Sequence, residues 1–449
     1  MVADVPASDP GDLSVVEAVE LLRRRVLSSR ELTDACLARI RDRDGAHSFD
    51  GDPASINAWV RVYEDDAQAA ASRADERLAR GDAPPLCGVP VGLKDLYAVA
   101  GKPLTASSRV LADVAARDCD AWVRLAAEGM VLLGHLHTHE FAAGGTTDQV
   151  GNPWSLDRSA GGSSGGSAAA LASHTTPAAT GTDTAGSLRI PSALCGTSTI
   201  KPTRGLVSIR GIFPLGPTLD HAGPMARSVA DCEPLLAAVA ATRPPRVLRS
   251  LRRVALSPRL ADLEADVAGN LDRALELLPL AAAPPPVAQL DVGAELLDVL
   301  TAGMLACHRR FDGQRDLYRP SVRGFLERAE RRALTAEEYV AVQERRAELT
   351  AAWVDWFAEQ RIDAVVEPTV PIVARPRGVG YEQAFTDVAE TSLTHYWNWT
   401  GFPVVALPSG LGRRSGLPTG VSLIGPPGAD WDLLAAGAAL QRELGSVVS

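Results

Sequence analysis

The chain has 449 residues, of which 46% are hydrophobic and 22% are charged, and its 55 acidic side chains outnumber 45 basic ones to give a formal charge of −10. This composition is typical of a folded globular protein and excludes wholesale intrinsic disorder. Charges of both signs are interspersed and no basic run occurs, so the sequence predicts no nucleic-acid partner.

The chain is expected to be cytoplasmic and to make no membrane contact. Residues 1–12 have neither the basic start nor the apolar stretch of a signal peptide, and nowhere do 18 apolar residues follow one another. The closest two of the six cysteines, at positions 87 and 119, are 32 residues apart. This spacing excludes a CxxC zinc or redox motif and a compact disulfide framework.

Two helices are predicted near the N-terminus, each beginning at a capping box. Ser14 is followed three residues later by Glu17, and Ser28 by Glu31, and apolar residues at helical spacing follow both pairs. From residue 86 the chain changes to short apolar runs that predict strands, with helical stretches between them. The predicted strands are 87–93, 130–133, 206–209 and 402–407, and the predicted helices are 121–128 and 167–173.

This alternation of short strands and helices predicts an α/β fold. The segment 240–390 differs because it is rich in Ala, Leu and Arg, with helices predicted at 261–278 and 336–360, and it is interpreted as a helical cap or insertion. No long polar linker divides the chain, so one large domain is expected over 1–449. Its parts are N-terminal helices (1–80), a catalytic core (85–235), the cap (240–390) and a C-terminal return to the core (395–449).

Two segments of small residues carry the candidate chemistry. The first, Ser159–Ser167, reads Ser-Ala-Gly-Gly-Ser-Ser-Gly-Gly-Ser and leads directly into a predicted helix. A glycine-rich turn of this kind can present backbone N–H groups to an anion, so phosphate binding is an alternative, although the Walker lysine is missing. The second, Gly181–Pro191, sets Ser187 behind small residues, as a nucleophile with an oxyanion hole requires.

A serine nucleophile needs a base, which histidine or lysine could supply. The string Gly-Gly-Ser-Ser-Gly at 161–165 matches the nucleophile elbow of Ser-His-Asp hydrolases, but the preceding residues are polar where an elbow follows a buried strand. Burial can instead turn a lysine into a base by lowering its pKa. Of three lysines, Lys94 ends an apolar run that predicts burial, Lys102 lies in a Gly-Pro turn and is expected to be solvated, and Lys201 could be either.

Together these motifs resemble the amidase signature family. The resemblance rests on Val-Gly-Leu-Lys-Asp ending at residue 95, on Gly-Gly-Ser-Ser-Gly-Gly-Ser at 161–167 and on Gly-Thr-Asp-Thr-Ala-Gly-Ser-Leu-Arg-Ile-Pro at 181–191. It continues through 201–205 and 218–224, returns at 401–403 and 416–421, and hardly extends to 240–390. It implies an α/β/α domain with a mixed, mostly parallel twisted sheet covered by helices on both faces.

The resemblance also assigns site residues by position. It makes Ser187 the nucleophile, Ser163 a bridging serine and Lys94 the base, with a cis peptide between Gly162 and Ser163. The N–H groups of Thr184, Ala185, Gly186 and Ser187 would form the oxyanion hole, supported by Gly162, Ser164, Asp183 and Arg189. Substrate contacts are expected from Gly144, Gly145, Thr146, Ile212 and Phe213 and from the 300–390 region, whereas Tyr396 and Trp397 are either pocket or, preferably, core residues.

The implied reaction is hydrolysis of a carbonyl C–N bond through an acyl-enzyme, extending to esters and carbamates, without a cofactor or metal. The expected partner is a small-molecule amide or carbamate, and the protein is expected to be a monomer or homodimer. Alternatives are the catalytic subunit of a tRNA-dependent amidotransferase and a non-catalytic binding scaffold. Two departures from the family pattern are Ala185, where many members have Gly, and the alternating His135, His137 and His139, which raise a metal site as a minor alternative.

Overall fold

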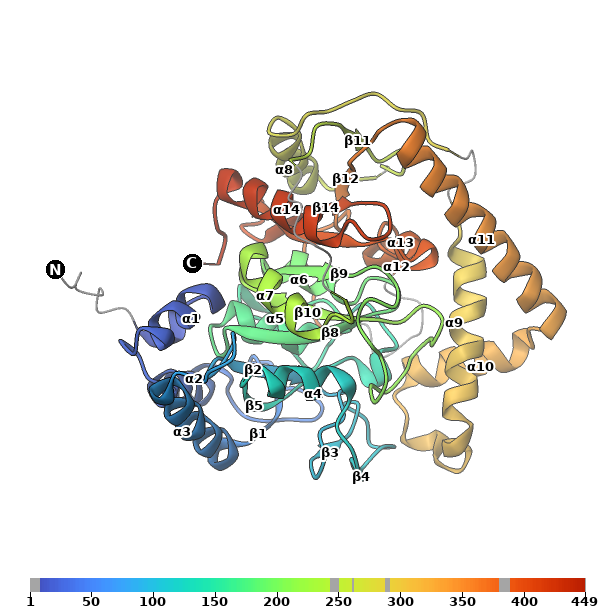
Figure 1. Ribbon diagram of the computed structural model, residues 1–449. Coiled ribbons are helices and arrows are strands. Elements are labelled where there is room, and N and C mark those ends of the chain that lie inside the picture. The colour runs from blue at the N-terminus through green and yellow to red at the C-terminus, as the bar shows by residue number, and fades with distance from the viewer. Residues whose placement is uncertain (1–8, 243–249, 261, 287–290, 379–387, 449) are drawn as a thin grey trace.

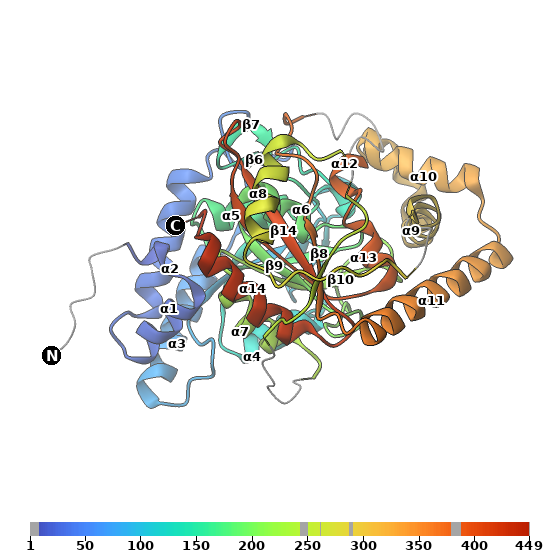
Figure 2. The same cartoon turned by 90° about the horizontal axis from the view of Figure 1, so that it is seen from above.

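The computed structural model describes residues 9–242, 250–260, 262–286, 291–378 and 388–448. Within these ranges ten strands form one sheet in the order β1-β5-β2-β8-β10-β9-β13-β14-β12-β11, and helices lie on both of its sides (Figures 1 and 2). The strands are β1 Trp59–Val62, β2 Pro90–Lys94, β5 Val131–Leu136, β8 Ala178–Asp183, β9 Ser198–Lys201, β10 His221–Ala226, β11 Val254–Leu256, β12 Ala364–Pro368, β13 Val404–Leu411 and β14 Pro418–Ile424.

The helices fall into an N-terminal group, a group on the sheet and a group that stands apart. The N-terminal helices are α1 Val15–Arg23, α2 Ser29–Arg43 and α3 Glu64–Arg80. Those beside the sheet are α4 Asp120–Ala127, α5 Gly165–Ala172, α6 Arg189–Cys195, α7 Val229–Val239, α8 Ala265–Leu275, α12 Val388–Thr391, α13 His395–Thr400 and α14 Asp430–Leu444. Helices α9 Gly293–His308, α10 Pro320–Arg332 and α11 Ala336–Glu359 project to one side of the molecule (Figure 2).

Short elements complete the described chain. Two small hairpins pair β3 Pro103–Leu104 with β4 Asp113–Val114 and β6 Gly151–Asn152 with β7 Ser155–Ser159. Three 3-10 helices span Pro10–Asp12, Glu140–Ala142 and Arg309–Leu317. None of the helices in the described part of the chain is long and apolar enough to span a bilayer.

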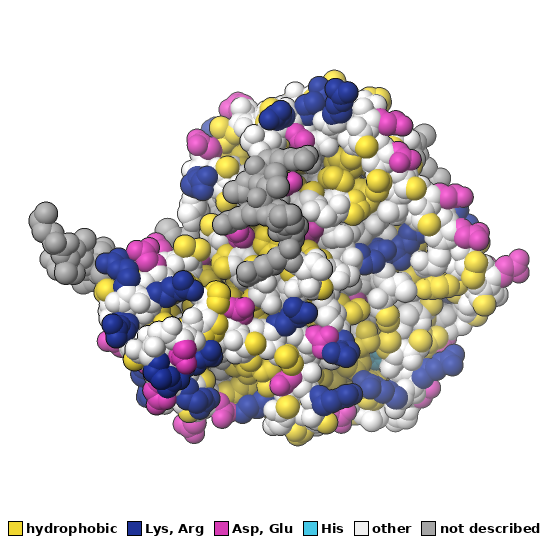
Figure 3. All heavy atoms as spheres, in the orientation of Figure 1, with side chains coloured by type: hydrophobic (Ala, Val, Ile, Leu, Met, Phe, Trp, Pro, Cys, Tyr) yellow, Lys and Arg dark blue, Asp and Glu magenta, His cyan; other side chains and the backbone are white. Residues whose placement is uncertain are grey.

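Charged side chains of both signs are mixed over the surface seen in Figure 3. On this face the Lys and Arg side chains, in dark blue, lie among Asp and Glu side chains, in magenta, and among apolar ones. The interspersed charges of the sequence therefore remain interspersed on this face of the folded chain.

The sheet is mixed and covered by helices, as the resemblance implies, although parallel pairing is restricted to two places. Strand β2 pairs in parallel with β5 and β8, and β11 with β12, whereas the other six pairings within this ten-stranded sheet are antiparallel. The parallel β2–β8 pair matters for the site because parallel strands end at the same edge of a sheet. Lys94 ends β2 and Asp183 ends β8, which brings these two positions near each other.

Most of the elements predicted from the sequence are present. Both N-terminal capping boxes form, at Ser14 with Glu17 and at Ser28 with Glu31. The runs 87–93, 130–133 and 402–407 contribute to β2, β5 and β13, and the stretches 121–128 and 167–173 to α4 and α5. The predicted strand at 206–209 is wrong, because turn bonds close there from Leu206 N to Thr203 O and from Ile212 N to Ile209 O.

The segment 240–390 is only partly a helical cap. It contains α8 to α11, but its β12 and β11 also extend the central sheet next to β14. Apolar runs of only three residues inside a stretch rich in Ala, Leu and Arg gave too little signal for these two strands. Residue 261, the predicted start of one helix, lies outside the described residues; the described helix there is α8, Ala265–Leu275.

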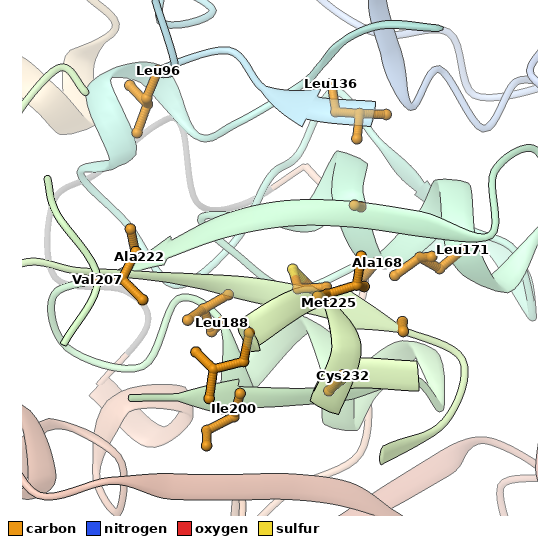
Figure 4. Close-up of a cluster of buried hydrophobic side chains, with 14 of the residues drawn as sticks. Leu96, Leu136, Ala168, Leu171, Leu188, Ile200, Val207, Ala222, Met225 and Cys232 are labelled. Carbon is orange, nitrogen blue, oxygen red and sulfur yellow. The ribbon is translucent and has the colours of Figure 1, made fainter. Parts of the chain in front are cut away.

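Buried apolar side chains from several elements form the core beneath the candidate site. Figure 4 shows Ala168 and Leu171 of α5 in one cluster with Ile200 of β9 and Met225 of β10. Gly181 of β8 packs so closely here that a Cβ would lie 2.6 Å from a methyl of Leu188 and 2.8 Å from the sulfur of Met225. The conformation of the turn after β8 is therefore coupled directly to the core.

Candidate active site

Three segments that are far apart in the sequence meet at one edge of the sheet. They are the end of β2 with Lys94, the loop before α5 with Ser163, and the turn from Asp183 to Leu188 that joins β8 to α6 with Ser187. Ser164 N donates to Ser187 O at 3.3 Å, which ties the loop to the turn. The three residues predicted to be catalytic are therefore brought together, and all three are buried.

The Lys94 amine lies among hydroxyl groups and not carboxylates. Its Nζ is 2.8 Å from each of Ser163 Oγ, Ser164 Oγ and Thr182 Oγ1, and the side chain is 0% exposed. Burial lowers the pKa of Lys94 well below its usual value, although the more distant Asp183 and Asp220 raise it. A neutral amine in this position can accept the Ser163 proton.

The loop around Ser163 is fixed by its backbone. The Gly162–Ser163 peptide is cis, and the Ser163 carbonyl accepts bonds from His139 N at 3.0 Å and Thr147 Oγ1 at 3.2 Å. A Cβ on residue 162 would lie 2.0 Å from Thr146 O, so only glycine fits there. These contacts hold Ser163 Oγ toward Lys94.

The turn that carries Ser187 is organised by one carboxylate, that of Asp183. Its Oδ1 accepts from Gly186 N at 2.8 Å and its Oδ2 from Leu188 N at 3.2 Å. Arg189 adds a bidentate pair, with Nε at 2.9 Å and Nη2 at 3.0 Å. Burial alone would raise the pKa of Asp183, but the adjacent Arg189 guanidinium outweighs burial and keeps the pKa far below its usual value. Asp183 is thus a permanent anion that shapes the turn.

Of the four N–H groups predicted to bind the oxyanion, one is already used within the protein. The Gly186 N–H is already donated to Asp183, whereas within the described residues the N–H groups of Ala185 and Ser187 have no protein acceptor. Thr184 stands at the same turn and its hydroxyl donates to Asp220 Oδ1 at 2.5 Å. The donors left for a substrate oxygen are therefore those of Thr184, Ala185 and Ser187, and not Gly186.

Helix α13 holds the turn from the opposite side, which the sequence did not predict. Asn398 Nδ2 donates to Asp183 Oδ1 at 2.7 Å and to Asp183 O at 2.9 Å, and Asn398 Oδ1 accepts from Arg189 Nη2 at 2.6 Å. Thr394 Oγ1 donates to Ala185 O at 2.6 Å. The available signal was a lone amide in the aromatic run Tyr-Trp-Asn-Trp at 396–399, a buried polar group that needs partners.

A cavity of about 710 Å³ opens beside Ser187. Of the predicted substrate contacts, Gly144 and Gly145 line it, whereas Thr146, Ile212 and Phe213 do not. Phe213 packs instead against Phe141 with ring centroids 4.9 Å apart, Ile212 is buried beside it, and Thr146 O accepts a hydrogen bond from His139 Nδ1 at 3.0 Å. The cap contributes Leu296, Leu297 and Leu300 of α9, and Phe325 of α10.

Tyr396 and Trp397 are core residues, as the sequence favoured. Both are 0% exposed, Tyr396 accepts from Trp353 Nε1 at 2.6 Å, and Trp397 Nε1 donates to Glu367 at 2.6 Å. Neither lines the cavity. Their role is to anchor α13 and hence Asn398.

Comparison with known proteins agrees with this geometry. The sequence profile of the Amidase family matches residues 49–261 and 307–434. The chain belongs to the amidase signature family. The A-type subunit of a glutamyl-tRNA(Gln) amidotransferase from Roseiflexus sp. (strain RS-1) is 34% identical over 485 aligned positions, which cover 96% of each chain. The corresponding protein from Roseiflexus castenholzii is 35% identical and covers 96% of this chain and 95% of its own.

Solved amidase signature structures share the fold along almost the whole chain. A structure described as a vestigial protein complex that reveals the origins of an s-triazine catabolic enzyme superposes with a TM-score of 0.87 at 29% identity, covering 97% of this chain and 100% of its own. A peptide amidase from Stenotrophomonas maltophilia gives 0.79 at 26% identity, covering 96% and 97%. The chain is thus an enzyme of a family that hydrolyses C–N bonds, and its tRNA-acting relatives weigh against the prediction of no nucleic-acid partner.

In this amidase signature enzyme the three alternating histidines do not form a metal site. His135 bonds Tyr63 and the Tyr97 carbonyl through its two ring nitrogens, and no cluster of three or more metal-ligating side chains occurs in the described ranges. Burial lowers the pKa of His137 and of His139 to about 3. These histidines are neutral, hydrogen-bonded core residues.

The other two lysines have no direct contact with Ser163 or Ser187. Lys102 pairs with Asp66 and lies 4.4 Å above the Tyr63 ring centroid at the surface. Lys201, which from the sequence could be either buried or solvated, is 0% exposed and donates to Pro202 O at 3.3 Å. Burial lowers its pKa, as for Lys94, but no serine lies within hydrogen-bond distance of its amine among the described contacts.

Proposed function

We propose that this chain is an amidohydrolase that cleaves a carbonyl C–N bond through an acyl-enzyme on Ser187, with Ser163 and Lys94 as the proton relay. The observation that carries the proposal is the buried Lys94 amine 2.8 Å from Ser163 Oγ, with no carboxylate within 4.0 Å among the described residues. Burial disfavours the ammonium form of an amine so placed, which is what the base of a serine relay requires.

In the proposed mechanism Lys94 accepts the Ser163 proton while Ser163 accepts the proton of Ser187. The Ser187 oxygen then attacks the carbonyl carbon, and the oxyanion is bound by the free N–H groups of the turn. Collapse breaks the C–N bond, and the proton returns through Ser163 to the leaving amine. Water, activated by the same relay, attacks the ester on Ser187 and releases the acid.

The experiment that tests this is covalent labelling with a serine-directed fluorophosphonate, followed by intact mass and peptide mapping. One adduct at Ser187 is expected, absent in Ser187→Ala and retained in Ser72→Ala, whose serine is exposed on α3. The lack of any adduct on the wild-type protein would contradict the assignment. It would instead support the alternative of a non-catalytic scaffold.

The proposed substrates are amides first, with esters and carbamates as an extension. All three carry a carbonyl that meets the same nucleophile and the same oxyanion donors, and they differ in the leaving group that takes the proton. Release of amine or alcohol from a matched set with one acyl group tests the range. Cleavage of the amide alone would remove esters and carbamates from the proposal.

A second candidate is the catalytic A-type subunit of an amidotransferase acting on glutamyl-tRNA. This candidate is favoured by the name of relatives that are 34% and 35% identical over nearly the whole chain. Sequence similarity alone supports it better than it supports a free-standing hydrolase. It would add a protein partner and a tRNA to the expected small-molecule substrate. Ammonia release from glutamine only in the presence of co-expressed partner subunits and glutamyl-tRNA would establish it, and turnover of simple amides by the isolated chain would argue for the hydrolase.

A further inference from the structure

One ring nitrogen in the wall of the cavity beside Ser187 has no hydrogen-bond partner. It belongs to His395, the first residue of α13, which lines this cavity. The other ring nitrogen, Nδ1, donates to the Thr391 carbonyl at 2.7 Å, because a carbonyl oxygen can only accept. Burial and, after it, the nearby Arg259 lower the pKa of His395 to about 4, so the ring is neutral. Its Nε2 is therefore an acceptor, and among the described residues it is buried without a partner.

A second acceptor stands beside this nitrogen. Asp291 is exposed, lies just before α9 and also lines the cavity. Its Oδ1 accepts from Gly293 N at 2.9 Å, which leaves Oδ2 without a described partner. A Cβ on Gly293 would lie 3.3 Å from Asp291 Oδ1 and 3.8 Å from His395 Nε2, so the two acceptors face the same space. We call Asp291 and His395 the acceptor pair.

The donors of this part of the wall are already used within the protein. Arg259 lines the cavity as well, but it donates to the carbonyls of Leu393 at 2.8 Å and Ser392 at 2.7 Å. Its guanidinium lies 4.5 Å above the Tyr396 ring. The charge of Arg259 is opposite to that of Asp291, so this part of the wall has no excess charge. What it offers a ligand is acceptors and not donors.

The substrate group that reaches the acceptor pair belongs to the acyl side. Ser187 lines the cavity, whereas Ser163 does not. In the proposed mechanism the leaving amine takes its proton from Ser163 and lies on that side, so the acyl group extends into the cavity. His395 follows Thr394, whose hydroxyl donates to Ala185 O at 2.6 Å, and this bond holds the acceptor pair close to the turn.

We propose that Asp291 and His395 select substrates whose acyl group carries a hydrogen-bond donor, either a hydroxyl or an amide N–H. This inference rests on the proposed acyl-enzyme on Ser187. Buried polar groups are nearly always hydrogen-bonded, and a donor from the substrate supplies the partner that His395 Nε2 lacks. An acyl group without a donor leaves this nitrogen unpaired. The acceptor pair is therefore a specificity determinant of the cavity.

The test compares 4-nitroanilides in pairs that differ only by a hydroxyl or a methyl group on the acyl part. The pairs are 6-hydroxyhexanoyl with heptanoyl, and meta- or para-hydroxyphenylacetyl with the corresponding methylphenylacetyl compound. In at least one pair the hydroxyl compound is expected to have about fivefold the kcat/KM of its methyl partner, as one hydrogen bond predicts. A methyl compound that is as good or better in all three pairs would overturn the proposal.

Variants assign the effect to the acceptor pair. His395→Phe keeps a ring but removes Nε2, and it is expected to lower the hydroxyl-to-methyl ratio of kcat/KM about tenfold. Asp291→Ala removes the carboxylate at an exposed position that is compatible with folding, and it should lower the ratio about fivefold. This second variant decides the question if the His395→Phe protein does not fold. An unchanged ratio in either folded variant overturns the acceptor pair.

Two further measurements complete the experiment. His47→Phe, at an exposed histidine outside the cavity lining, is the matched control and should leave the ratio unchanged. Cleavage without any preference for the hydroxyl compounds, in a protein whose Ser187 is labelled by fluorophosphonate, overturns the acceptor pair alone. Absence of both labelling and turnover overturns the acyl-enzyme itself.

Discussion

Replacement of Asn398 by alanine tests whether α13 positions the nucleophile. Asn398 is 0% exposed, donates two hydrogen bonds to Asp183 and accepts one from Arg189. The variant removes all three while leaving Ser187, Ser163 and Lys94 in place. Asp183 then keeps its ion pair with Arg189 but loses the link that fixes it to α13.

The size of the effect follows from these contacts. A hydrogen bond to a charged group contributes roughly 1.5–3 kcal/mol, and two of the three bonds, to the Asp183 carboxylate and from the Arg189 guanidinium, are of this kind. Their loss should therefore lower the free energy of unfolding by about 3–6 kcal/mol. Catalysis should suffer more than binding, because displacement of a reacting group by about 1 Å can cost 10²-fold in rate. We therefore expect kcat to fall about 10²-fold with little change in KM.

The assay combines steady-state kinetics on an amide with the rate of fluorophosphonate labelling of Ser187, which reports the nucleophile directly. Asn270→Ala is the matched control, since Asn270 is also buried and its amide donates to Thr419 at 2.9 Å, away from the turn. This control should lose stability but keep kcat and the labelling rate. Equal kinetics in the two variants would refute the positioning role and leave Asn398 as a structural residue only.

Four further outcomes are expected. Ser187→Ala should lower kcat by about 10⁶-fold in a discontinuous amine-release assay, and near-normal turnover would exclude it as the nucleophile. Lys94→Arg keeps the charge but cannot act as a base, so activity should fall about 10³-fold, whereas survival of activity would point to a charge-only role. Because burial lowers the pKa of Lys94 below its usual 10.5, kcat/KM should fall only when the pH drops through that lowered value. Between the lowered and the usual pKa, Lys94 binds a proton in the unfolded chain but not in the folded one. Stability measured by urea titration should therefore rise with pH across this range. Gly162→Ala should lower Tm and abolish labelling, because its Cβ would meet Thr146 O at 2.0 Å.

The sequence predicted those parts of the site that depend on local chemistry. Lys94 ends a run of apolar residues and is buried, and the small-residue segments around Ser163 and Ser187 form the loop and the turn that enclose them. Burial and backbone freedom each require particular residue types over a few neighbouring positions, so both leave a local signal. Strands β2, β5 and β13 were predictable for the same reason, because each is a short apolar run.

Features that depend on tertiary contacts were not predictable. Asn398 bonds to Asp183 across 215 residues of sequence, and nothing in its neighbourhood indicates that partner. Ile212 and Phe213 looked like pocket residues, but an aromatic cluster with Phe141 takes Phe213 into the core. Strand β11 has only three residues and exists because β12 pairs with it, so its sequence carries little strand signal.

The Asp183 carboxylate decides how many N–H groups of the turn are left for a substrate oxygen. Because one of its oxygens accepts the Gly186 N–H, the turn is rigid but offers one oxyanion donor fewer than a free turn of four residues. Removal of a single donor typically costs 10²–10³-fold in kcat in other serine hydrolases, so the remaining N–H groups must be held accurately to compensate. Bonds from Arg189, Asn398 and Thr394 to this short turn supply that accuracy. In the proposed mechanism the geometry of the oxyanion hole thus depends on α13, which begins more than two hundred residues after Ser187 in the sequence.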